Sequence, residues 1–148
     1  MGLFDNIKKS LKLHQMDDPF FGVIIFQRSK VWEGKKLFEP LSREIHFTIV
    51  ADEDGPQQAH QEFFYQLGLR YHQLREHLEQ SLVQELSKKM NKPFTGNART
   101  EFRLDSFLIP DPRVIPHQWE LVFFSESTDR FFYVFMDGWQ LKGIKVAE

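Results

Sequence analysis

Residues 56–90 read PQQAHQEFFYQLGLRYHQLREHLEQSLVQELSKKM and carry the strongest structural signal in the chain. Large apolar side chains recur every three or four residues, the spacing that places them on one face of an α-helix. This stripe consists of Phe63, Phe64, Leu67, Tyr71, Leu74, Leu78, Leu82 and Leu86. The spacing predicts one helix over residues 56–90, about 50 Å long at a rise of 1.5 Å per residue.

Strand patterns lie on both sides of this helix. Three are expected within residues 20–50, and a meander over residues 100–146 closes on the hairpin turn Asp137-Gly138. Because the helix stands outside the runs of strands, the order predicts an α+β fold: an antiparallel sheet of six or seven strands with the long helix packed on one face. The helix is longer than such a sheet, so it either bends near Gly68 or overhangs.

The first 16 residues have their own amphipathic pattern. Leu3, Phe4, Ile7 and Leu11 share one helical face, and Asp17, Asp18 and Pro19 end the pattern. We therefore expect a short N-terminal helix over residues 1–16 that docks on the rest of the domain. The alternative is a membrane-surface adaptor that uses this helix to lie on lipid.

Composition excludes several classes of protein. The chain has 148 residues, which suits a single domain over 1–148, and it has no cysteine, so disulfides and thiolate metal sites are excluded. The net charge of −2 argues against broad nucleic-acid binding, so no nucleic-acid partner is expected. The sequence contains neither a membrane-spanning apolar run nor a secretory signal pattern, and we expect a cytoplasmic protein.

The most conspicuous polar cluster is Asp52-Glu53-Asp54, placed between a strand and the long helix. Acids at this position are expected to cap the helix and favour its dipole. The alternative is a small enzyme in which Asp52, Asp54 and His60 form an acid–base site. The chain carries no nucleophile elbow, phosphate-binding loop or metal-ligand spacing, so we expect no catalytic residue, metal or cofactor.

The chain holds 16 phenylalanines, and two strands are apolar on both faces. One face is covered by the helix, so the surplus predicts a non-catalytic protein-binding module and a two-fold homodimer. The candidate partner-binding residues are Phe21, Ile24, Phe26, Leu69, Val83, Phe132 and Val134.

The order of parts resembles a family of small uncharacterised bacterial α+β domains. The resemblance covers roughly Phe21 to Val146 and rests on Trp32-x-Gly34, on ADEDGP at 51–56, on the Gln/Glu-rich helix and on the final Asp137-Gly138 hairpin. It implies a bacterial domain without assigned activity, in some cases an immunity protein that binds and blocks a toxin. The acidic–histidine pair associated with the pattern is replaced here by Thr128-Asp129-Arg130.

Overall fold

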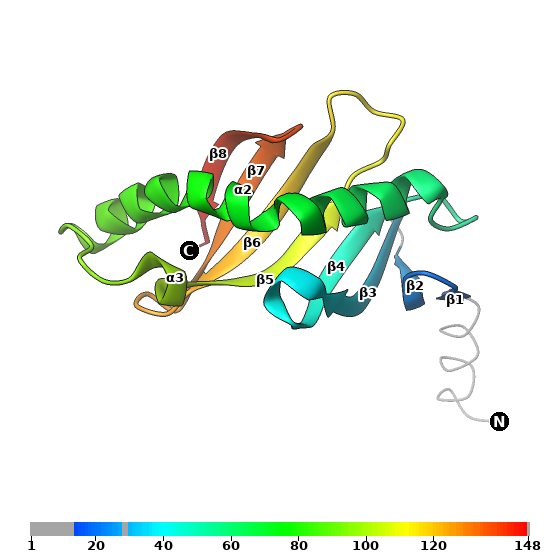
Figure 1. The fold of residues 1–148 in the computed structure, drawn as a ribbon, viewed down its shortest axis with the longest axis horizontal. Helices are drawn as coiled ribbons and strands as arrows, with labels where there is room; N and C mark the ends of the chain where they lie inside the picture. Colours follow the sequence, from blue (N-terminus) through cyan, green and yellow to red (C-terminus); the bar gives the residue numbers. More distant parts are fainter. Residues whose placement is uncertain (1–13, 28–29, 148) are drawn as a thin grey trace.

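The structure, a computed structural model, describes residues 14–27 and 30–147. These residues form one eight-stranded sheet crossed on one face by a long helix (Figure 1). The strands are β1 (Gln15–Asp18), β2 (Gly22–Gln27), β3 (Val31–Phe38), β4 (Arg43–Val50), β5 (Phe102–Ile109), β6 (Gln118–Ser125), β7 (Arg130–Asp137) and β8 (Gln140–Val146). The helices are η1 (Glu39–Leu41), α2 (Gln58–Met90) and α3 (Ala98–Glu101). The predicted α+β class is confirmed.

The strands lie in the sheet in chain order, from β1 to β8. Every neighbouring pair is antiparallel except β4 and β5, which are parallel. The antiparallel prediction therefore holds for the two four-stranded halves and is wrong at their junction. The helix α2 carries the chain back across the sheet between these two strands, and a crossover of this kind joins parallel strands.

The strand count was predicted as six or seven and is eight in the structure. The additional strand is β1, which pairs with β2 through a tight turn. In this turn a carboxylate oxygen of Asp18 accepts the backbone N–H groups of Phe20 and Phe21, each at 2.8 Å. An aspartate that bonds the backbone two or three residues ahead stabilises a turn. The segment expected to end a helix therefore closes a hairpin.

The N-terminal helix predicted for residues 1–16 falls mostly on residues 1–13, which lie outside the described residues. Its docking on the domain and its alternative role on a membrane surface stay predictions. The end of the predicted range is different in the structure, because Gln15 and Met16 belong to β1.

The long helix is confirmed at nearly the predicted bounds, and its whole predicted apolar stripe is buried. It runs without a break through Gly68, and in Figure 1 its C-terminal turns extend past β8. The overhang, rather than a bend, therefore resolves the mismatch in length. The core lies between this stripe and the facing side of the sheet, where Phe47, Phe107 and Val134 are fully buried.

Candidate functional site

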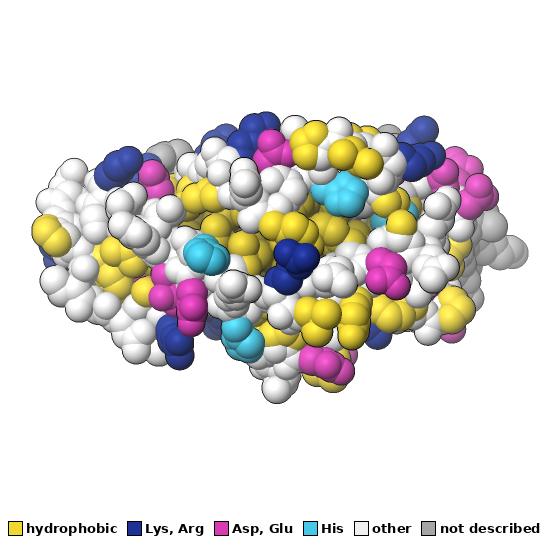
Figure 2. All heavy atoms as spheres, turned by 45° about the horizontal axis from the view of Figure 1, so that its top comes forward, with side chains coloured by type: hydrophobic (Ala, Val, Ile, Leu, Met, Phe, Trp, Pro, Cys, Tyr) yellow, Lys and Arg dark blue, Asp and Glu magenta, His cyan; other side chains and the backbone are white. Residues whose placement is uncertain are grey.

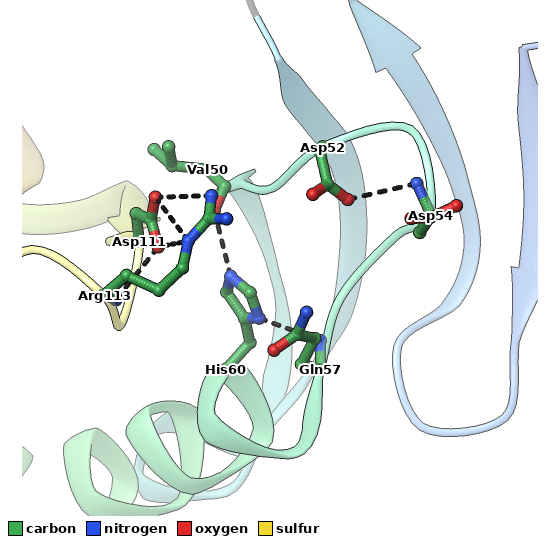
Figure 3. A network of polar contacts seen from close by, with 7 residues as sticks. All are labelled: Val50, Asp52, Asp54, Gln57, His60, Asp111 and Arg113. Atoms are coloured by element: carbon green, nitrogen blue, oxygen red, sulfur yellow. Dashed lines mark hydrogen bonds and ion pairs between the residues drawn. The ribbon is translucent and has the colours of Figure 1, made fainter.

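The acid–base alternative depends on His60, which lies in the first turn of α2 (Figure 3). Its Nδ1 accepts the backbone N–H of Gln57 at 2.9 Å, and its Nε2 lies 2.9 Å from the carbonyl oxygen of Val50. A ring nitrogen that accepts a hydrogen bond carries no proton, so the N–H of this ring is at Nε2. This N–H donates a hydrogen bond to the carbonyl oxygen of Val50. Both ring nitrogens of this buried side chain are thus hydrogen-bonded to backbone groups, so His60 connects the start of α2 to the end of β4.

The acids of the cluster do not converge on this histidine. A carboxylate oxygen of Asp52 accepts the backbone N–H of Asp54 at 3.2 Å, and in Figure 3 the carboxylate of Asp54 points away from His60. The helix begins at Gln58 with Gln57 as its N-cap, and its first turn contains no acid. The expected capping role of Asp52 and Asp54 is therefore wrong. These acids shape the loop between β4 and α2 instead.

A charged pair that sequence reasoning missed lies beside His60. Arg113 donates from Nη2 to Asp111 at 2.9 Å, and the hydrogen bonds from its side chain and backbone lower the pKa of the Asp111 carboxyl. The two residues are separated by one position in the Pro-rich loop between β5 and β6, so the pair is local. Within residues 14–27 and 30–147, no three His, Asp or Glu side chains gather closely enough to hold a metal ion.

The structure divides the predicted partner-binding residues into three groups by their exposure. Phe21, Ile24, Phe132 and Val134 are buried beneath α2 in the core, so their side chains offer no surface to a partner. Phe26 and Val83 are half-buried and pack against the same core. Only Leu69 stands out from the surface, with 65% of its area exposed.

A hollow of about 530 Å³ lies next to Leu69, between the helix and one end of β3. We call it the α2–β3 groove. Its helix wall carries Tyr65 and Leu69, exposed to 59% and 65%, and its sheet wall is the end of β3 from Lys36 to Phe38. Phe64 and Phe20 also line it. Two strongly exposed apolar side chains therefore border a concavity that is also lined by aromatic rings, an arrangement typical of a binding surface.

The other side of α2 is more closed. There Trp139 stacks on Phe63 with ring centroids 5.4 Å apart, and the guanidinium of Arg70 lies 4.8 Å above the Trp139 ring. Figure 2, in which the top of Figure 1 is turned toward the viewer, shows hydrophobic side chains gathered along the middle of this face. The aromatic rings here are packed on one another and capped by the arginine, so this side serves mainly the core.

The face of the sheet opposite the helix has two shallow hollows, of about 500 and 480 Å³, with Glu120 on the rim of both. Burial raises the pKa of the Glu120 carboxyl. Val23 and Ile25, the neighbours in β2 of the buried Ile24, are exposed at one end of this face. The surplus apolar surface predicted from the sequence is therefore present at Val23 and Ile25 of β2, whereas His46 and Thr48 of β4 make the middle of this face polar.

A further hollow of about 560 Å³ beside the middle of α2 is lined by several arginines. Two of these arginines form hydrogen bonds to the backbone. Arg43 donates to the carbonyl oxygen of Leu104 at 2.7 Å, and Arg75 donates to the carbonyl oxygen of Ala98 at 2.9 Å. These two arginines flank Tyr71, whose pKa is raised by burial. Their role is to hold β4, β5 and α3 around the helix.

No helix in the described part of the chain combines the length and the apolar character needed to cross a bilayer. Sequence reasoning identified Leu69 in the α2–β3 groove because it lies off the buried stripe, and it missed Tyr65, which lies one turn earlier on the same side of the helix. Comparisons with models of protein families, with curated proteins and with solved structures find no match to this chain.

Proposed function

We propose that this chain is a non-catalytic protein-binding module and that the α2–β3 groove is its binding surface. The observation that supports the proposal is that Tyr65 and Leu69, each more than half exposed, border one hollow that Phe20 and Phe64 also line. Burying one leucine side chain in a partner contributes about 1.5–3 kcal/mol. A toxin-blocking role in a bacterial cytoplasm, which the resemblance to immunity-protein-like domains implies, would use a surface of this kind.

The test compares two matched substitutions of exposed apolar residues. Leu69→Glu places a charge in the groove, whereas Ile115→Glu changes a residue that is 84% exposed in the loop between β5 and β6. The full chain and both variants are chemically cross-linked in native lysate and the captured proteins are quantified by mass spectrometry. We expect a defined protein that is retained by the wild type and by Ile115→Glu and lost with Leu69→Glu. Equal capture by all three chains would contradict the proposal.

A second candidate is a homodimer formed through the open face of the sheet, and the exposure of Val23 (55%) and Ile25 (40%) favours it. A two-fold contact would bury each copy's open face, and about 800 Å² per partner suffices for a standard interface. Light scattering at micromolar concentration decides this candidate. Ile25→Lys should return a dimeric mass to 17.7 kDa, and a wild-type mass of 17.7 kDa that does not change with concentration would reject it.

A further inference from the structure

The strand β3 is paired along its full length on one side only. Toward β4 all eight residues from Val31 to Phe38 have partners. Toward β2 the pairing covers Val31 to Glu33 and stops. The segment 34–38 therefore has a second edge without a partner strand, and alternate residues there direct their N–H and C=O groups toward it.

The strands separate because the hairpin of β1 and β2 leaves the plane of the sheet. Its tip packs onto the helix side, where Phe21 contacts Phe47 and Phe64 at ring centroid distances of 5.5 and 6.0 Å. Gly34 permits this crossing, since a Cβ there would lie 2.8 Å from Cγ2 of Ile24. The exposed edge is thus a consequence of packing in the core.

The two outer edges of the sheet are poorer sites for pairing. The strand β1 has only four residues, and β8 has an irregular register opposite Phe135 and Met136. Short strands and bulges are features that discourage edge-to-edge pairing. The inner edge at 34–38 instead borders an apolar hollow, because Lys36, Leu37 and Phe38 line the α2–β3 groove.

We infer that the partner of this module binds as an extended segment that adds a strand to β3 at residues 34–38; this inference rests on the proposed function of the groove. Backbone hydrogen bonds to the edge supply affinity in this mode, and pockets for alternate side chains supply specificity. Side chains of an added strand alternate between the two faces of the sheet. Those on the helix side enter the groove beside Tyr65 and Leu69, and those on the other side lie next to Lys35.

The positive charges of Lys35 and Lys36 at this edge favour an acidic partner segment. Lys35 is exposed, and its only described ion pair is a long one of 3.8 Å to Glu44. A second copy paired antiparallel about the middle of this edge would place Lys36 opposite Lys36 of the other copy, and like charges directly opposite are destabilising. The N-terminal segment of this chain contains Lys8, Lys9 and Lys12 and meets the same repulsion. A segment that alternates apolar and acidic residues satisfies both the groove and the lysines.

The test uses three fluorescent heptapeptides and the full-length protein. The first alternates glutamate with valine and isoleucine, the second has lysine in place of each glutamate, and the third is the first with its apolar residues N-methylated on the backbone. We expect the first to bind at least about tenfold more tightly than either of the others, because methylation removes backbone donors and lysine reverses the charge. Leu69→Glu should weaken the first peptide, and Ile115→Glu should not.

Amide exchange measured by NMR locates the binding. In the free protein, alternate amides of residues 34–38 should exchange rapidly, and the first peptide should protect them. Equal binding of the N-methylated peptide would overturn strand addition while leaving the groove as a binding surface. Absence of binding by the first peptide, or protection of these amides in the free protein by the chain's own N-terminal segment or by a second copy, would also overturn it.

Discussion

The Nε2 atom of His60 in the first turn of α2 lies 2.9 Å from the carbonyl oxygen of Val50, the last residue of β4. The same ring accepts the N–H of Gln57, the residue before the helix. One side chain therefore joins the end of the strand, the connecting loop and the helix start. Because α2 is the crossover between the two halves of the sheet, this brace fixes the direction in which the helix leaves the sheet.

Replacing His60 with leucine should lower the free energy of unfolding by about 1–3 kcal/mol, since the carbonyl of Val50 and the N–H of Gln57 would each lose a partner in a partly buried place. Urea unfolding followed by circular dichroism measures the change. His77 is exposed on the same helix, so His77→Leu is the matched control and should change stability by less than about 0.5 kcal/mol. Similar effects of the two substitutions would contradict the bracing role.

The sequence pattern singled out His60, Asp52 and Asp54 as a group, but the capping role predicted for the two acids is wrong. His60 lies one turn before Phe64, in line with the buried stripe, and it is buried with that stripe. The partners of the ring are backbone groups, and one of them, the carbonyl of Val50, is ten residues away. Such a contact depends on how the loop folds, and no residue pattern encodes it.

Gly34→Ala should destabilise the protein by about 1–3 kcal/mol, as overpacking of a core usually does. The added Cβ would lie 2.8 Å from Ile24 Cγ2 and 3.0 Å from the Phe47 ring, and both neighbours are buried. Gly143→Ala in β8 is the control, because nothing lies within 4 Å of its added Cβ. A thermal shift as small for Gly34→Ala as for Gly143→Ala would show that β2 can move aside.

Gly68→Ala should have the opposite effect and raise the free energy of unfolding by about 1 kcal/mol. Glycine in the interior of a helix costs about this much relative to alanine. The helix is continuous through this position and no atom lies within 4 Å of an added Cβ, so nothing offsets the gain. Denaturant unfolding tests the prediction, and a destabilised variant would show that the backbone at Gly68 departs from a regular helix.

The parts of the fold that the sequence predicted are those with a periodic apolar pattern. The stripe from Phe63 to Leu86 predicted the helix, and short apolar runs between turn residues predicted six or seven of the strands. The strand β1 was not predicted, because its four residues, Gln15–Asp18, contain a single apolar side chain, Met16. The turn at Asp18 stabilises this strand instead. The parallel pairing of β4 with β5 was not predicted, because the crossover helix sets the relative direction of these strands and the residues of the strands do not encode it.

Glu120 gives the protein a pH dependence of stability whose direction can be stated. Burial raises the pKa of its carboxyl above the ordinary value of 4.5, so the folded state holds this proton more tightly than the unfolded state. Stability then falls as pH rises from the ordinary pKa through the raised one, and the penalty is complete above that window.

Glu120→Gln removes the ionisable group and keeps its shape. It should therefore be more stable than the wild type at neutral pH, and the difference should shrink as the pH is lowered toward 4.5. Urea titrations over this range measure the difference, and a variant that is less stable at neutral pH would show that the carboxylate has a favourable partner on the open face of the sheet.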